Sequence, residues 1–315
     1  MFDADKFITQ TINDLKNTIK DKALIAFSGG VDSTVCAAIV NKAIGKNLIA
    51  VHVDTGYMRK NESKDVKKTM EEMDLNYKFI DASKDFYKDL KGVLDPEKKR
   101  KIIGEKFIRV FEKVAEKENI KYLVQGTIAP DWIESGDNLR DTIKSHHNVG
   151  GLPKQMKLSL IEPLRDLYKD EVRKVARVLK LSVSERQPFP GPGLAIRVIG
   201  DATPEKTEIV REACYIVETE IDLAVEKGMM ERPWQYFAVL IPIKTVGVQG
   251  DKRAYGNTIA IRAVQSIDAM TCAYSDIPHK VMDKISSKIT NTLGEKVNRI
   301  VYDVTNKPPA TVEWE

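Results

Sequence analysis

One short stretch, residues 28–34 (SGGVDST), has the composition of a phosphate-binding turn. A glycine turn that leads into a helix points several backbone N–H groups and the positive end of the helix dipole at one spot, which attracts phosphate. The hydroxyl groups of Ser28, Ser33 and Thr34 add donors, and Asp32 can hold a magnesium ion that the phosphates share. The stretch therefore predicts a site for a nucleotide polyphosphate with Mg²⁺.

This turn differs from the common phosphate loop G-x-x-x-x-G-K-[ST], because Asp32 rather than a lysine precedes the hydroxyl residue Ser33. Transfer of a γ-phosphoryl group, as in kinases and GTPases, is therefore disfavoured. The pattern is similar to the pyrophosphate loop of the N-type ATP pyrophosphatases, which cleave ATP between the α and β phosphates and adenylate a carbonyl oxygen. The alternative is an ordinary strand-to-helix turn rich in glycine and serine, which seven matching positions disfavour.

Alternating strands and helices are predicted to position this turn. An apolar run at 23–27 precedes it as a buried strand, and a small-residue helix at 35–40 follows it. Further strands are predicted at 48–53, 77–80, 122–125 and 158–161, and further helices at 8–19, 66–73, 102–114 and 168–179. Such alternation predicts an α/β domain with a parallel sheet and helices on both faces. Ligands of these sheets bind at the carboxyl ends of the strands, where the turn lies.

A long polar stretch, residues 129–157, separates the fourth and fifth predicted strands. Loops of this length inside a compact domain are usually functional, often as a lid over a site. The alternative is a solvated insertion in which the adjacent His146 and His147 have no role.

The pattern changes at the proline–glycine segment 187–193, where we place a domain boundary that divides the chain into residues 1–186 and 187–315. The second domain is predicted to contain strands at 194–199, 237–243, 258–264 and 299–304 and helices at 204–227 and 281–293. This pattern indicates a small α+β domain with an antiparallel or mixed sheet, whose apolar open face predicts burial against another subunit.

Composition narrows the class of protein. The 315 residues are 42% apolar and 30% charged, as in a soluble globular protein long enough for two domains. The formal net charge of +4 is too small to indicate a nucleic-acid partner, and no apolar run approaches the ~20 residues that span a membrane. Cys36, Cys214 and Cys272 are too far apart in sequence for a zinc site or a redox pair, which favours a cytoplasmic location.

Segments along the whole chain resemble the synthetase part of the GMP synthetase family. Besides the loop, they are DTGYMR at 54–59, DPEKKRKIIG at 95–104, QGT at 125–127, PDWIES at 130–135, IKSHHNVGGLP at 143–153, FPGPGL at 189–194 and KPPATVEWE at 307–315. The segments at 143–153 and 307–315 are highly specific to that family, whereas the loop alone would also fit NAD synthetase, asparagine synthetase, argininosuccinate synthetase or tRNA-thiolating enzymes. Ala129 departs from the pattern, since many members have tyrosine there.

The resemblance implies an N-type ATP pyrophosphatase (adenine nucleotide alpha hydrolase-like) domain followed by a small α+β dimerisation domain. The C2 carbonyl oxygen of XMP would attack the α-phosphorus of ATP, and ammonia would then displace AMP to give GMP. The implied ATP contacts are Ser28, Gly29, Gly30, Val31, Asp32, Ser33, Thr34, Val53 and Gly126, with Asp32 also the magnesium ligand. The implied adenylation-site residues in the lid are Asp131, Glu134, Lys144, His146, His147 and Asn148.

The implied contacts with XMP are Arg100, Gln235, Arg299, Lys307, Thr311, Val312 and Glu313. Lysine and arginine suit the phosphate of XMP, and Glu313 can accept N–H bonds from its base. Taken alone, Asp32 could be an ordinary acid at a helix N-terminus, and Arg100 lies in a charge run typical of a solvated face. The ending Glu-Trp-Glu has the composition of a disordered tail, whereas the family pattern predicts that it is ordered and functional.

Members of this family often carry a glutamine amidotransferase domain in front, with a cysteine nucleophile that helps to free ammonia. Only a short stretch precedes Ser28 here, and Cys36 falls inside the helix predicted after the loop. We therefore expect a separate glutamine amidotransferase subunit to supply ammonia, and a homodimer through the C-terminal domain. The rival hypotheses are a tRNA-modifying pyrophosphatase, which needs catalytic cysteines and a basic face, and a regulatory subunit that binds ATP without turnover.

Overall fold

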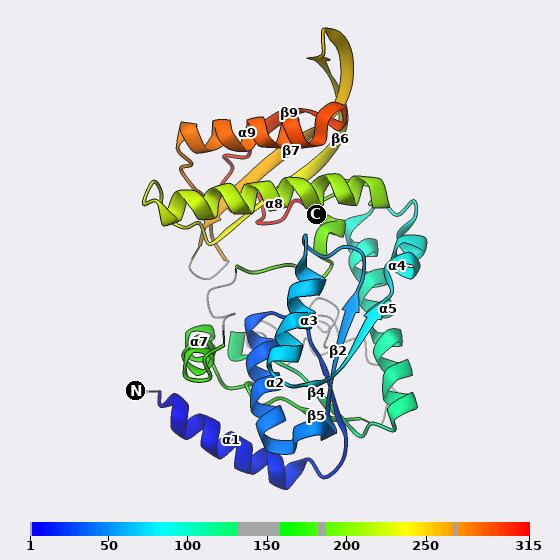
Figure 1. The fold of residues 1–315 in the computed structure, drawn as a ribbon, viewed down its shortest axis with the longest axis vertical. Coiled ribbons are helices and arrows are strands. Elements are labelled where there is room, and N and C mark those ends of the chain that lie inside the picture. The colour runs from blue at the N-terminus through cyan, green and yellow to red at the C-terminus, as the bar shows by residue number, and fades with distance from the viewer. Residues whose placement is uncertain (1, 131–157, 182–186, 267–269) are drawn as a thin grey trace. The chain divides into compact units, whose positions relative to one another are not determined.

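A computed structural model describes residues 2–130, 158–181, 187–266 and 270–315, and the chain divides into two compact units (Figure 1). The first unit comprises Met1–Thr55, Asn61–Ala82 and Lys101–Gly191, and the second comprises Gly56–Lys60, Ser83–Arg100 and Pro192–Glu315. Two short segments from the first third of the chain thus belong to the second unit. The division at residue 187 stays a prediction.

The first unit is built on a five-stranded sheet in the order β3-β2-β1-β4-β5, in which all paired strands are parallel. Its strands are β1 (Ala23–Ala26), β2 (Leu48–Asp54), β3 (Asn76–Asp81), β4 (Tyr122–Val124) and β5 (Ser159–Ile161). Its helices are α1 (Ala4–Thr18), α2 (Val31–Ile44), η1 (Gly45–Asn47), α3 (Glu62–Glu72) and α7 (Lys169–Val178), together with most of α5 (Pro96–Glu118). The predicted α/β architecture is confirmed.

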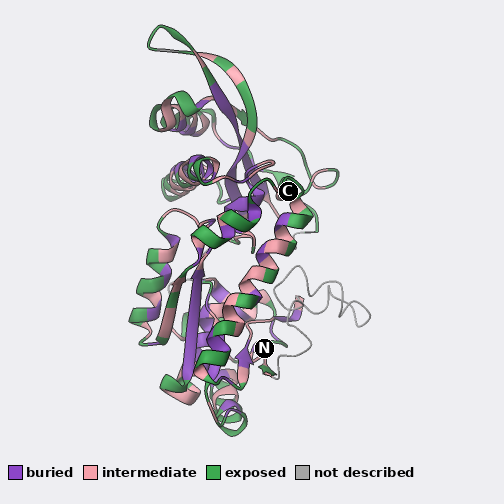
Figure 2. Ribbon diagram, turned by 90° about the vertical axis from the view of Figure 1, so that its right-hand side faces the viewer, coloured by how far each residue is buried: buried purple, intermediate pink, exposed green. Residues whose placement is uncertain are grey.

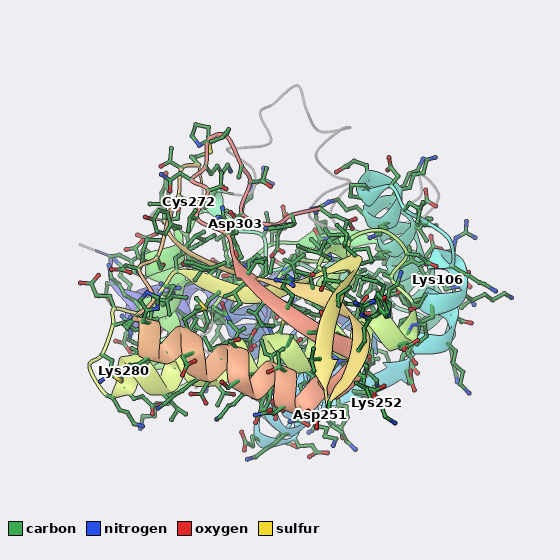
Figure 3. All side chains as sticks on the ribbon, turned by 90° about the horizontal axis from the view of Figure 1, so that it is seen from above. Lys106, Asp251, Lys252, Cys272, Lys280 and Asp303 are labelled. Atoms are coloured by element: carbon green, nitrogen blue, oxygen red, sulfur yellow. The ribbon has the colours of Figure 1, made fainter. Side chains whose placement is uncertain are left out.

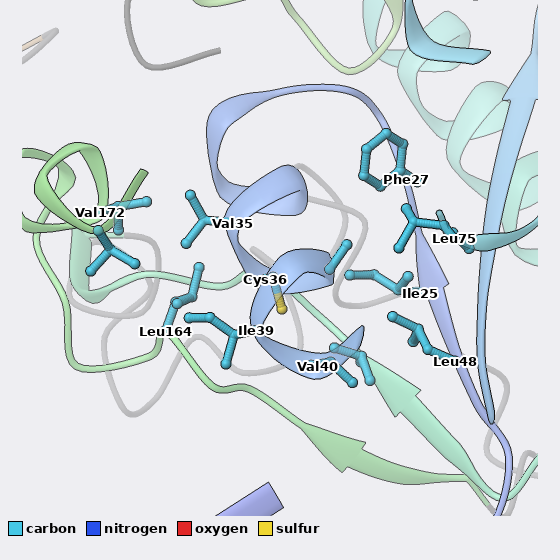
Figure 4. Close-up of a cluster of buried hydrophobic side chains, with 14 of the residues drawn as sticks. Ile25, Phe27, Val35, Cys36, Ile39, Val40, Leu48, Leu75, Leu164 and Val172 are labelled. Carbon is cyan, nitrogen blue, oxygen red and sulfur yellow. The ribbon is translucent and has the colours of Figure 1, made fainter. Parts of the chain in front are cut away.

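Helix α2 forms the centre of this unit's core because it is apolar on almost every side, as expected of a helix covered by other elements. Figure 4 shows Val35 of α2 near Val172 of α7, and the Cys36 thiol lies 3.6 Å from the carbonyl oxygen of Gln125, just after β4. The strands it covers are buried, while the flanking helices keep exposed outer faces (Figure 2). Burial raises the pKa of the Cys36 thiol well above its usual range, which fits packing rather than nucleophilic chemistry.

The second unit contains a mixed sheet, as its α+β pattern predicts. Strands β6 (Gln235–Gln249) and β7 (Lys252–Gln265) form a long antiparallel hairpin, whose turn is residues 250–251, and Figure 3 labels Asp251 in that turn and Lys252 at the start of β7. Strand β9 (Val297–Tyr302) runs parallel to β7, and the short β8 (Ala273–Tyr274) is antiparallel to it. The helices of this unit are α4 (Ser83–Leu90), η4 (Gly193–Ile196), α8 (Pro204–Glu226), α9 (His279–Leu293) and η5 (Gly294–Lys296). Helix α4 was not among the predicted elements.

One predicted element is wrong: residues 194–199 do not form a strand. They begin with the 3₁₀ helix η4, and only an isolated bridge joins Val198 to Leu240 of β6. Gly193 has a φ of +64°, and a Cβ there would lie 2.4 Å from the carbonyl oxygen of Tyr57. The chain therefore turns tightly at this glycine. The apolar residues that follow Gly193 are buried, as they would be in a strand. The sequence alone therefore could not distinguish a 3₁₀ helix from a strand at this place.

Within the described ranges, no helix is long and apolar enough to cross a membrane.

Candidate functional site

The loop of residues 28–34, called the nucleotide loop below, joins the carboxyl end of β1 to the start of α2. Gly29 has a φ of +76°, and Gly30 caps α2 without any side-chain acceptor for the first-turn N–H groups. The side chains of Ser28 and Ser33 lie 2.9 Å apart (Oγ to Oγ), and the Gly30 N–H donates to Ser28 Oγ at 3.2 Å. A helix start without a cap leaves its backbone donors to a ligand, and an anion is the ligand that they and the helix dipole favour.

Asp32 is the charged group of the nucleotide loop. Its Oδ2 accepts a hydrogen bond from Lys169 Nζ at 2.6 Å, whereas its Oδ1 is buried and has no hydrogen-bond partner among the residues that the structure describes. Magnesium usually takes one or two carboxylates and fills its remaining positions with phosphates and water. A single carboxylate oxygen beside a helix start whose donors favour an anion fits that ion. Among the residues that the structure describes, no group of three or more histidine, cysteine or acidic side chains could hold a metal by itself.

Two residues outside the loop contact it or the residue before it, and a third lies on the neighbouring strand. A Cβ on Gly126, just after β4, would lie 3.1 Å from the carbonyl carbon of Asp32, so the end of β4 touches the start of α2. His52 Nδ1 donates to the carbonyl oxygen of Phe27, the residue before the loop, at 2.9 Å. Val53 is buried near the carboxyl end of β2, where it pairs with Ile80. The structure thus brings Gly126 to the loop and places Val53 on the neighbouring strand at the same edge of the sheet.

All six residues predicted for the lid chemistry lie outside the described residues: Asp131, Glu134, Lys144, His146, His147 and Asn148. Their roles therefore stay predictions.

The last ten residues, 306–315, called the C-terminal tail below, are tied to the second unit by ion pairs. Glu313 forms a two-pronged pair with Arg197: Arg197 Nη2 donates to Oε1 at 2.8 Å and Arg197 Nε to Oε2 at 3.1 Å. Gln235 Nε2 also donates to Glu313 Oε1, at 3.1 Å. Burial disfavours the charge of Arg197, but the charge and hydrogen bonds of Glu313 outweigh it and the guanidinium pKa is raised. The tail is therefore ordered here, contrary to the expectation from its composition.

The end of the tail is held by two basic residues of α5. The Lys99 ammonium is fully buried and donates to the Glu315 carboxylate and to the carbonyl oxygens of Ala195 and Val198. Burial lowers the pKa of Lys99, and the Glu315 carboxylate opposes that shift. Arg100 Nη2 donates to the Glu315 main-chain oxygen at 2.5 Å. Arg100 therefore contacts the tail and is not part of a solvated face.

The buried Arg262 of β7 contacts the chain on both sides of the middle of the tail. Its guanidinium donates to the carbonyl oxygens of Thr305 and Thr311, on the two sides of the KPPA segment, and pairs with Asp303 at 3.3 Å. The backbone of Lys307 pairs with that of Cys272, which is shown with Asp303 in Figure 3.

Of the remaining residues predicted to contact XMP, Arg299 is exposed on β9 and Val312 is half-buried beside Glu313. Of the predicted XMP contacts, Gln235 thus meets Glu313 directly, and Arg100 reaches the tail at Glu315.

Sequence reasoning missed four cations that hold these regions: Lys169, Arg197, Arg262 and Lys99. Lys169 is the first residue of α7. A positive charge is unfavourable at a helix N-terminus because of the helix dipole, so a lysine at this position indicates an acidic partner elsewhere. Arg197 and Arg262 each stand alone in an apolar run, which is a usable signal of a buried, paired charge. Lys99 gave no such signal, because the basic residues around it resemble a solvated face.

Two family models match the chain. One described as "GMP synthase C terminal domain" matches residues 222–314, and one described as "Queuosine biosynthesis protein QueC" matches residues 22–187. Whole-chain relatives are more specific. The chain is 54% identical to the B subunit of the glutamine-hydrolyzing GMP synthase of Methanopyrus kandleri, with 100% of both chains covered. It is 55% identical to the protein of the same name from Pyrococcus horikoshii, with 99% of this chain and 100% of the relative covered.

Another relative is longer, and one solved structure covers most of the chain. The glutamine-hydrolyzing GMP synthase of Thermotoga petrophila is 53% identical over 98% of this chain and 62% of its own length. The solved structure is the NMN synthetase of Francisella tularensis, at 13% identity with a TM-score of 0.49, over 94% of this chain and 97% of that one.

Proposed function

The chain belongs to the family formed by the B subunits of glutamine-hydrolysing GMP synthase, and from this premise we propose which of its residues bind each substrate and which act in adenylation. The reaction is the ATP-dependent amination of XMP to GMP, which releases AMP and pyrophosphate, and a separate glutaminase subunit supplies the ammonia. The C2 carbonyl oxygen of XMP bonds to the α-phosphorus of ATP as pyrophosphate leaves. Ammonia then bonds to C2 as AMP leaves, because AMP is a far better leaving group than an amide-like oxygen.

The nucleotide loop is proposed to hold the departing pyrophosphate. The observation that carries this role is the start of α2, where Gly30 provides no capping side chain and the Ser28 and Ser33 hydroxyls lie on the same turn. Donors already in place stabilise charge that builds up on the leaving group, since little reorganisation is then needed. Asp32 would hold Mg²⁺ through Oδ1, and that ion would neutralise phosphate charge. Lys169, paired with Asp32 Oδ2, would place a second positive charge beside the phosphates.

The C-terminal tail is proposed to hold XMP. Lys307 and Arg299 would bind its phosphate, and Glu313 would accept an N–H of its base. Thr311, Val312, Gln235 and Arg100 complete the proposed set. The lid residues at 131–148 are proposed to act in adenylation and, when closed, to keep water from the adenylated base.

Pyrophosphate release tests the function directly. Purified protein with ATP, Mg²⁺, XMP and ammonium should release pyrophosphate and form GMP without any second subunit. Glutamine in place of ammonium should fail until the glutaminase subunit is added. No release with ammonium would overturn the proposed function, and release with nicotinate adenine dinucleotide in place of XMP would point to NAD synthesis.

We also propose a homodimer that forms through the second unit. Its hairpin exposes several large apolar side chains on β6, including Ile243, Val246 and Val248. Exposed apolar surface of this kind marks contacts between proteins. Light scattering that returned a monomer at micromolar concentration would contradict the dimer. A cytoplasmic location, expected from the cysteine spacing, stays part of the proposal.

A further inference from the structure

The burial of Arg197 costs free energy, and the fold by itself does not need a charged residue at this position. Only 1% of its side chain is exposed, and taking a guanidinium out of water is unfavourable even when it is paired. A well-packed apolar residue could fill the same volume with equal or better stability. A buried arginine aimed at a carboxylate of the proposed XMP site therefore points to a role in that site.

The surroundings of Arg197 fix the plane of its guanidinium. The ring of Phe237 lies beneath it, with the guanidinium carbon 3.9 Å from the ring centroid. Its backbone N–H donates to Leu194 and its carbonyl oxygen accepts from Leu240, so the main chain is tied to both η4 and β6. The Glu313 carboxylate pairs with this fixed guanidinium. A lysine, which carries a point charge on a flexible stem, could not hold the carboxylate in one plane.

The hydrogen bonds leave one oxygen of Glu313 with spare capacity. A carboxylate oxygen can accept two hydrogen bonds. Oε1 receives two, from Arg197 Nη2 and Gln235 Nε2, while Oε2 receives one, from Arg197 Nε. No other donor to this carboxylate is present among the described residues, and 14% of the side chain is exposed. The remaining acceptor position of Oε2 is thus the one that a ligand can use.

We propose that Arg197 is a positioning residue for XMP. It holds the Glu313 carboxylate in one plane so that Oε2 presents its remaining acceptor position to an N–H of the purine base. This inference rests on the proposed role of Glu313 in binding XMP. Arg197 does not itself contact the substrate, and its effect passes entirely through Glu313.

A double-mutant cycle tests this dependence. The wild type, Arg197→Lys, Glu313→Gln and the double variant are compared by initial rates of pyrophosphate release with ammonium, varying XMP and then ATP. Arg197→Lys should raise KM for XMP roughly tenfold, because one charge-assisted hydrogen bond and the fixed geometry are lost, and should leave KM for ATP unchanged. In the Glu313→Gln background the same substitution should add less than about twofold.

A matched control and a second variant keep the test decisive. Arg232→Lys alters another arginine–carboxylate pair of the same unit, with Asp222, and should leave both KM values unchanged. If Arg197→Lys does not fold, Phe237→Leu replaces it. Loss of the ring beneath the guanidinium should raise KM for XMP about threefold, and again not in the Glu313→Gln background.

Each contrary outcome has a distinct meaning. Additive effects of Arg197→Lys and Glu313→Gln on KM for XMP would show a merely structural arginine and overturn the inference alone. An unchanged KM for XMP in Glu313→Gln would overturn the proposed role of Glu313 and the inference with it. Absence of pyrophosphate release by the wild type would overturn the proposed function itself.

Discussion

The nucleotide loop takes its shape from its own backbone, whereas the C-terminal tail takes its shape from cations far away in sequence. In the loop, the glycines and the hydroxyls of Ser28 and Ser33 contact residues within five positions along the chain. In the tail, Glu313 pairs with Arg197 at a separation of 116 residues and Glu315 with Lys99 at 216. The proposed phosphate site is thus formed by one turn and one helix, whereas the proposed site for the purine base needs side chains from several elements.

This contrast predicts that the tail matters more for stability than the loop does. Deletion of residues 306–315 would leave Arg197 and Lys99 buried without their carboxylates, at a cost of about 3–5 kcal/mol for each broken pair. We expect a large fall in the urea midpoint and loss of XMP-dependent pyrophosphate release. Unchanged stability and XMP affinity in the truncated protein would erase the contrast between the two regions.

Replacement of the loop's carboxylate should do the reverse, with a large effect on rate and a small one on stability. Asp32→Asn removes the charge that is proposed to hold Mg²⁺, and we expect kcat to fall roughly 100-fold. Asp170→Asn is the control, since it changes an exposed carboxylate on α7 that pairs with Lys174. An Asp32→Asn enzyme within threefold of the wild-type rate would mean that the loop works through backbone donors alone.

A smaller effect is expected where the loop meets its neighbouring strand. In Gly126→Ala the new Cβ would lie 3.1 Å from the Asp32 carbonyl carbon and 3.3 Å from the Ser33 nitrogen, so the start of α2 must shift by a few tenths of an ångström. We expect KM for ATP to rise about three- to tenfold, because such small displacements weaken oriented contacts. Gly104→Ala provides the comparison, because a Cβ there would meet no described atom beyond its own stretch of helix within 4 Å. Equal effects of the two substitutions would show that the contact with Asp32 does not position the loop.

The smallest expected effect is the contribution of His52, which hydrogen-bonds to the residue before the loop, to the pH dependence of stability. Burial lowers the pKa of His52 in the folded protein, although its hydrogen bond to Phe27 acts in the other direction. The unfolded state therefore binds more protons than the fold between the folded pKa and the unperturbed value near ~6.5, and stability falls as pH drops below about 6.5. We expect the urea midpoint to be lower at pH 5.5 than at pH 7.5, and His52→Gln to reduce that difference.

The exposed His279 at the start of α9 supplies the control for this measurement. His279→Gln should retain the pH dependence of the wild type. A wild-type midpoint that did not change between the two pH values would contradict the burial of a neutral His52.

Most of the first unit was predictable because its signals are local. Glycine positions, apolar runs and the alternation of strands with helices depend on neighbouring residues, and these placed β1, the nucleotide loop and α2 correctly. The failure at 194–199 has a local cause as well, since three buried apolar residues look alike in a strand and in a 3₁₀ turn. Helix α4 is amphipathic, but it is short, and it was not predicted.

The sequence by itself determined that a glycine turn with the composition of a phosphate-binding site follows β1 and that the chain resembles the family to which it belongs. Only the tertiary structure decided which charges meet: Lys169 with Asp32, Arg197 with Glu313, and Lys99 with Glu315. The reason is physical. Backbone conformation is set by steric limits within a few residues, whereas an ion pair between distant residues exists only once packing has brought both charges out of water at the same place.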